Sequence, residues 1–99
     1  MREPVSEADV ERYLVARALA YRAVVRKVAW PGRRGAPDRV LMLPGGRVVW
    51  VELKSPGLAA TFPSNAHERQ QDREHRRMRR AGQPVYVVDS YAGVNRVFE

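Results

Sequence analysis

Apolar residues recur every three or four positions near the beginning of the chain, at Val10, Tyr13, Leu14, Ala18 and Tyr21. This period places them on one face of a helix, which we expect to run to about Tyr21. Ser6 and Asp9 lie three positions apart and resemble a capping box at the helix start. The pattern therefore predicts a first helix with one buried face.

Valine-rich segments in the middle of the chain have the character of strands. Residues 23–30 predict a first strand that ends at a Pro-Gly pair. Residues 39–43 and 47–54 are separated only by a Pro-Gly-Gly segment, which is typical of a hairpin with a three-residue loop. Residues 85–88 predict one more short buried strand.

A second helix is indicated after the looser segment of residues 55–65. Ser64 or Asn65 can cap its start, and Gly82 follows its expected end at about Ala81. The face that we expect to point inward carries His67, Gln71, His75 and Met78. Residues 89–99 predict only a short turn followed by an extended tail. The predicted fold is one α/β domain over residues 1–99, of order αβββαβ, with a mixed sheet flanked by helices.

The charge of the chain points to an anionic partner. Its 99 residues include 18 Lys and Arg against 11 Asp and Glu, for a formal charge of +7. A basic domain of this kind is typical of nucleic-acid binding, although solubility alone is an alternative explanation of the charge. The absence of cysteine excludes disulfides, zinc ribbons and thiol nucleophiles. No apolar run approaches the length of a membrane span, so we expect a cytoplasmic protein with no membrane partner.

The predicted hairpin brings charged residues together. A three-residue loop pairs Leu43 with Arg47, and this register places Asp38 directly opposite Glu52. Lys54 lies on the same face, because side chains alternate along a strand. In the alternative interpretation, Glu52 and Lys54 lie at a solvent-facing strand end and Asp38 caps a turn.

Two carboxylates beside a lysine suit metal-dependent hydrolysis. Without cysteine or a histidine pair, the oxygens of Asp38 and Glu52 favour Mg²⁺ or Mn²⁺, and the backbone carbonyl of Leu53 is a further candidate ligand. Such a metal polarises a phosphate and activates water, while Lys54 orients the nucleophile or stabilises charge. The implied chemistry is hydrolysis of a phosphodiester bond.

The same residues carry a resemblance to a known family. Pro37-Asp38 followed by Glu52-Leu53-Lys54 resembles the motif of the PD-(D/E)XK nuclease superfamily. Together with the surrounding segments 33–39, 43–47 and 51–55, it is similar to the VRR-NUC family, particularly its compact stand-alone members from phages and bacteria. The resemblance spans roughly residues 6–90.

This resemblance implies a restriction-endonuclease-like core, dependence on Mg²⁺ or Mn²⁺, and a homodimer that acts on branched DNA such as Holliday junctions. It also implies a location inside a bacterium or a phage-infected cell. A glutamate of the first helix and a glutamine of the second complete the family's site, and Glu7 and Gln71 are the matching positions. Glu11 and Gln70 remain alternatives, although the apolar stripe of the first helix lies closer to Glu7.

Basic residues are the candidate contacts to DNA. Lys27 fits a recurrent basic position of the family, and Arg33 and Arg34 lie in the following turn. The outward face of the second helix carries a stripe of Arg69, Arg73, Arg76 and Arg80, which can follow phosphates or form an ordinary solvated surface. Two other classes of function stay open: a non-catalytic DNA-binding module and a structure-specific RNase.

Overall fold

The computed structural model of the chain describes residues 3–99. Its elements in chain order are α1 (Glu7–Ala20), β1 (Val24–Lys27), β2 (Arg39–Met42), β3 (Val48–Leu53), α2 (Ala66–Arg80), β4 (Val85–Val88) and α3 (Tyr91–Val97). The strands form one mixed sheet in the order β1-β2-β3-β4. The first two pairings are antiparallel, and β3 and β4 run parallel. The predicted α/β class with a mixed sheet flanked by helices is confirmed.

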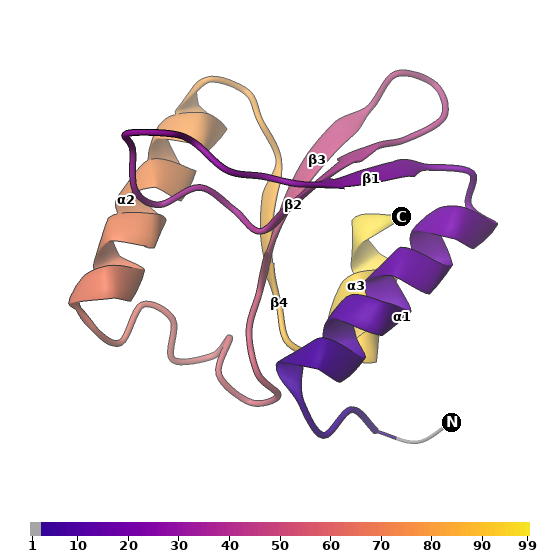
Figure 1. The fold of residues 1–99 in the computed structure, drawn as a ribbon, viewed down its shortest axis with the longest axis horizontal. Helices are drawn as coiled ribbons and strands as arrows, with labels where there is room; N and C mark the ends of the chain where they lie inside the picture. The colour runs from indigo at the N-terminus through magenta and orange to yellow at the C-terminus, as the bar shows by residue number, and fades with distance from the viewer. Residues whose placement is uncertain (1–2) are drawn as a thin grey trace.

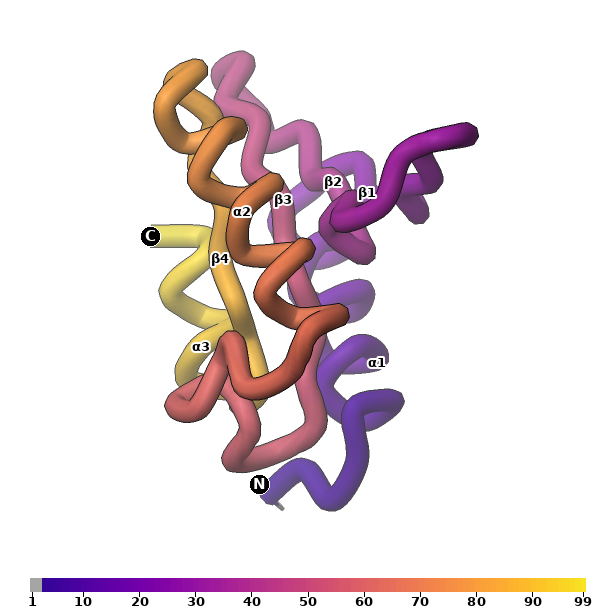
Figure 2. The backbone as a smooth tube through the Cα atoms, turned by 90° about the vertical axis from the view of Figure 1, so that its left-hand side faces the viewer, coloured from indigo at the N-terminus to yellow at the C-terminus, as the bar shows by residue number. Residues whose placement is uncertain are grey.

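The helices cover both faces of the sheet. In Figure 1, α1 and α3 lie on one side of the strands and α2 lies on the other. Figure 2 shows the same layering from the side of α2, with β3 and β4 behind it. The parallel pairing of β3 and β4 requires a crossover connection, and α2 provides it. The helix of this crossover therefore covers the face of the sheet opposite α1.

The two faces differ in chemistry. On the side of α1 and α3, apolar residues of α1, the sheet and α3 form the hydrophobic core, among them Val10, Leu14, Val51, Leu53 and Val94. On the side of α2, the buried residues of the helix are mostly polar: Glu68, Gln71, Glu74, His75 and Met78. Gln71, His75 and Met78 face inward as predicted. The prediction that His67 also faces inward is wrong, because His67 is exposed and its neighbour Glu68 is buried instead.

Capping side chains define where the helices begin. Ser6 Oγ accepts a 3.2 Å hydrogen bond from the Asp9 N–H, as predicted for α1. Asp9 does not reciprocate as in a full capping box, because its Oδ2 accepts from the Val5 N–H instead. For α2 the cap is Asn65, whose side chain accepts from the Glu68 N–H at 2.8 Å.

Two predicted boundaries are wrong. The first strand extends only over Val24–Lys27 rather than residues 23–30. The Val28 N–H still donates to the Asp38 carbonyl oxygen at 3.0 Å, and the chain then turns at Trp30. The extended tail expected in residues 89–99 is the helix α3, so the element order is αβββαβα. Ser90 caps α3, and Val94 and Val97 of this helix are fully buried in the core. Tertiary packing stabilises a helix that is too short to form alone.

Candidate active site

The hairpin register places Asp38 opposite Glu52, as the loop length predicts. Arg39 pairs with Val51 in the β2–β3 ladder, so the preceding Asp38 faces Glu52. The loop itself is closed by a 2.7 Å hydrogen bond from the Leu43 N–H to the Arg47 carbonyl oxygen. Beyond the ladder, the Leu53 N–H donates to Asp38 Oδ2 over 2.7 Å. The end of β3 therefore holds the Asp38 side chain in place.

Glu52 and Lys54 are buried, although they are charged. Their exposed fractions are 2% and 9%, and they lie on the face of the sheet that α2 covers. The alternative of a solvent-facing strand end is therefore wrong. Burying charged groups is unfavourable unless partners or ligands compensate, so their neighbours decide what they can do.

Gln71 joins the two buried charges. Its Nε2 donates to Glu52 Oε2 at 3.0 Å, and its Oε1 accepts from Lys54 Nζ at 3.0 Å. Gln70, the alternative position, lies nearer the surface and accepts from Arg73. The structure therefore brings Gln71, and not Gln70, into contact with Glu52 and Lys54.

Glu68 is a further partner of Lys54 that the sequence analysis missed. Its Oε2 lies 3.0 Å from Lys54 Nζ, while the other oxygen accepts from both the N–H and the hydroxyl of Ser64. The Phe62 ring lies 5.0 Å from the same ammonium and stacks against His75. The signal was the spacing of Glu68, Gln71 and His75, which puts all three on one helix face.

The carboxyl group of Glu52 is buried among charged neighbours. Burial raises its pKa above the ordinary value of 4.5, nearby Asp38 raises it further, and His75 and Lys54 oppose the rise. Its Oε1 is buried without a hydrogen-bond partner, and His75 Nε2 lies 3.5 Å away. Because Glu52 Oε1 makes no hydrogen bond, it is the oxygen of this carboxylate that a cation can use.

The structure also separates the two glutamates of α1. Glu7 lies in the first turn, where partial burial and the charge of Asp38 raise its pKa and Lys54 lowers it. Glu7 is exposed, but it is within electrostatic reach of the cluster. Glu11 is instead 2.7 Å from Arg39 in an ion pair. Glu11 is thus engaged by Arg39, whereas the charges of Asp38 and Lys54 act on Glu7, so Glu7 stays the candidate from α1.

These residues fit a hard divalent cation held by few protein ligands. Within residues 3–99, no three His, Asp or Glu side chains are arranged as a metal cage. Asp38 and Glu52 nonetheless offer two carboxylates, one of them with the unpartnered oxygen described above. Two residues beyond the last paired position of the β2–β3 register, Leu53 comes opposite Pro37, and proline has no N–H to donate to the Leu53 carbonyl oxygen. Mg²⁺ binds such sites through one or two carboxylates and keeps several waters.

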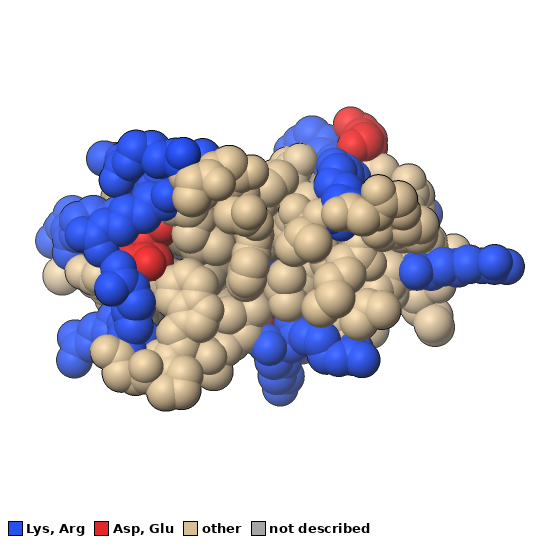
Figure 3. Space-filling model, turned by 90° about the horizontal axis from the view of Figure 1, so that it is seen from above, with Lys and Arg blue, Asp and Glu red and all other residues tan. Residues whose placement is uncertain are grey.

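The candidate DNA contacts lie along α2, in the loop that follows β1 and, for Lys27, at the end of β1 itself. Figure 3 shows Lys and Arg side chains gathered at the end of the molecule where Figure 1 places α2. The predicted stripe is exposed throughout, although Arg76 pairs with Asp72 at 2.5 Å. Arg33 is exposed too, but its Nε and Nη2 donate to both carboxylate oxygens of Glu74 at 2.9 and 2.8 Å. That pair anchors the loop to α2.

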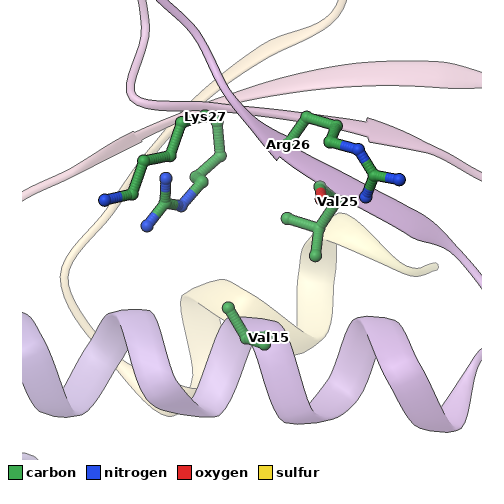
Figure 4. A pocket seen from close by; sticks show the side chains of 5 residues that line it. Val15, Val25, Arg26 and Lys27 are labelled. Carbon is green, nitrogen blue, oxygen red and sulfur yellow. Dashed lines mark hydrogen bonds between the residues drawn. The ribbon is translucent and has the colours of Figure 1, made fainter.

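A pocket of about 270 Å³ lies elsewhere, between α1 and β1. Figure 4 shows Val15 and Val25 facing each other across it, with Arg26 and Lys27 on the strand above. Arg39 completes the lining. Of the predicted contacts to DNA, Lys27 alone lines this pocket, and the carboxylate cluster on the α2 face does not open into it.

A buried glutamate, a half-buried aspartate opposite it and a lysine beside them form the charged cluster of this α/β domain, at the end of a hairpin and under a crossover helix. No protein-family profile matches the chain. "Putative nuclease p44" of Acyrthosiphon pisum secondary endosymbiont phage 1 is 37% identical over 86 residues, which are 87% of this chain and 85% of that protein. A solved structure described as "VRR_NUC domain" is similar with a TM-score of 0.76 and 33% identity, over 96% of both chains. The chain belongs to the VRR-NUC nuclease family. Within residues 3–99, no helix is long and apolar enough to cross a bilayer.

Proposed function

We propose that this protein is a metal-dependent endonuclease that hydrolyses phosphodiester bonds in DNA. The observation that carries the proposal is the meeting of Asp38 and Glu52 across the β2–β3 hairpin with Lys54 beside them. Membership of the VRR-NUC family and similarity to a phage protein named as a nuclease support it.

Asp38, Glu52 and the Leu53 carbonyl oxygen are the proposed ligands of Mg²⁺ or Mn²⁺. Both carboxylates are anchored before any ion arrives: Asp38 by the Leu53 N–H, and Glu52 by Gln71. Bound there, the ion would supply Lewis acidity toward a phosphate oxygen and lower the pKa of a bound water. Glu7 of α1, on which the charges of Asp38 and Lys54 act, is the proposed further acidic residue of the site.

Lys54 and Gln71 position the reacting groups. Two of the three ammonium hydrogens of Lys54 are directed to Glu68 and Gln71, which leaves one for the attacking water or the phosphate. The Lys54 ammonium stabilises the negative charge that develops on the phosphate oxygens during the reaction. Gln71 fixes Lys54 and Glu52 relative to each other, because it hydrogen-bonds to both.

The surface supports a nucleic-acid substrate. The formal charge is +7, and exposed arginines extend along α2. We propose that Lys27, Arg34 and the stripe of α2 contact phosphates, and that Arg33 contributes if DNA displaces it from Glu74. By resemblance to compact family members, the substrate is branched DNA such as a Holliday junction, the protein acts as a homodimer in the cytoplasm, and residues 1–99 constitute one nuclease domain.

Cleavage of a set of end-labelled linear, flap and four-way DNAs tests this function. The wild type is expected to cut in Mg²⁺ or Mn²⁺ but not in EDTA, and Lys54→Ala is expected to be inactive while still binding DNA. Matched RNA branches are run in parallel, and preferential cleavage of RNA would replace DNA as the substrate. Binding without cleavage in either metal would make the protein a DNA-binding module instead.

A further inference from the structure

Lys54 has two carboxylates within reach, and only one of them holds it closely. Glu68 Oε2 lies 3.0 Å from Lys54 Nζ, whereas Glu52 Oε2 lies at 3.8 Å, beyond hydrogen-bond distance. Glu52 satisfies Oε2 with the Gln71 amide and leaves Oε1 without a hydrogen bond. The lysine is therefore paired with a residue that is not among the proposed metal ligands.

Glu68 is itself fixed in place. Ser64 donates two hydrogen bonds of 2.8 Å to Oε1, one from its N–H and one from its hydroxyl. These bonds and the nearby Lys54 lower the pKa of Glu68 to about 2, so it is an anion at any working pH. The Phe62 ring, 5.0 Å from Lys54 Nζ, borders the ammonium as a further attractive neighbour.

From this arrangement we propose that Glu68 is a positioning residue that holds the Lys54 ammonium away from Glu52 and so keeps Glu52 free to bind the metal. The inference rests on the proposed function. A lysine and a divalent cation compete for the same carboxylate, because both are stabilised by its negative charge. Without Glu68, the nearest remaining anion for Lys54 is Glu52, and a contact of 3.8 Å needs only a small side-chain movement to become a hydrogen bond.

Direct binding of Mn²⁺, measured by titration calorimetry on the protein without DNA, tests the proposal. Glu68→Ala is expected to bind Mn²⁺ about tenfold more weakly than the wild type, since a charge-assisted hydrogen bond must be displaced. The double variant Lys54→Ala/Glu68→Ala is expected to recover wild-type affinity, because the competing ammonium is gone. Asp72→Asn, which removes a carboxylate of the same helix that pairs with Arg76 and not with Lys54, is the matched control and is expected to bind as the wild type does.

The outcomes separate this proposal from the function on which it rests. Wild-type protein that binds no Mn²⁺ would defeat the metal-dependent function itself. Wild-type affinity in Glu68→Ala, or equal weakening in the single and double variants, would overturn the positioning role and leave the function intact. If Glu68→Ala does not fold, Ser64→Ala carries the test, because it loosens Glu68 without removing the partner of Lys54. A smaller weakening, reversed by adding Lys54→Ala, is then the expected result.

Discussion

The backbone N–H of Leu53 donates a 2.7 Å hydrogen bond to Oδ2 of Asp38. Asp38 precedes β2, whereas Leu53 ends β3 directly after Glu52, so one backbone group fixes the spacing of the two carboxylates. The end of strand β3 therefore sets this geometry. Ligands held this way need little reorganisation when a cation binds, which is the condition for a precise catalytic site.

Replacing Asp38 by Asn tests the charge of this residue separately from its hydrogen bond. The amide oxygen of Asn can still accept from the Leu53 N–H, so the thermal midpoint of unfolding is expected to change little. Metal-dependent cleavage is expected to fall by more than about 100-fold, since an anionic ligand is lost. Cleavage rates at saturating Mg²⁺, measured beside the unfolding midpoint, provide the check. Full activity in Asp38→Asn would remove this residue from the site.

Gln71 and Gln70 form a natural pair of variants. Gln71→Ala removes the side chain that bonds to both Lys54 and Glu52, so we expect kcat to fall about 10- to 100-fold with little change in KM for DNA. Gln70→Ala removes only a surface hydrogen bond to Arg73 and is expected to keep kcat. Single-turnover cleavage at saturating enzyme measures the difference. Equal losses in the two variants would contradict the role of Gln71.

The raised pKa of Glu52 predicts a particular dependence of stability on pH. The folded protein holds the Glu52 proton more tightly than the unfolded chain, so this group's contribution is complete below the ordinary pKa of 4.5. The contribution is then lost as pH rises through the higher folded pKa. Glu52→Gln removes the buried charge, and we expect it to unfold at a higher temperature than the metal-free wild type at about pH 8.

The gain in Glu52→Gln should shrink toward acidic pH, where wild-type Glu52 is protonated. Added Mg²⁺ should raise the unfolding midpoint of the wild type more than that of the variant, because a ligand that binds only the folded state stabilises it. Glu99→Gln, at an exposed terminal residue, is the control. A difference between wild type and Glu52→Gln that does not vary with pH would show that burial does not perturb this group.

Arg33 and Arg34 are neighbours with different expected roles. Arg33 holds Glu74, a buried carboxylate whose pKa it lowers, so Arg33→Ala is expected to lower the unfolding midpoint. Arg34→Ala is expected to weaken DNA binding without affecting stability. Thermal unfolding and DNA affinity at two salt concentrations distinguish the two effects. An unchanged midpoint in Arg33→Ala would show that its pair with Glu74 contributes nothing to the fold.

The hairpin and its register could be predicted from the sequence, because both depend on residues that are close together in the chain. The three-residue loop fixes the register, and the register alone places Asp38 opposite Glu52. Gln71 followed from family resemblance, and its inward direction followed from helical periodicity. These features depend on residues that are close in sequence or on a strict structural period.

The features that sequence analysis missed depend on tertiary packing. Which of His67 and Glu68 points inward depends on how α2 is rotated against the sheet, and periodicity alone does not determine that angle. The pairing of Arg33 with Glu74 joins residues 41 positions apart. Helix α3 spans only 7 residues, and its stability comes from the core against which it packs.

A crystal of the protein soaked in Mn²⁺, with anomalous diffraction recorded to locate the ion, tests the central claim most directly. The account predicts one anomalous peak at about 2.0 to 2.2 Å from carboxylate oxygens of both Asp38 and Glu52. The Leu53 carbonyl oxygen is expected at a similar distance. A peak that touches neither carboxylate, or density for Lys54 in hydrogen-bond contact with Glu52 and no ion between the two acids, would contradict it.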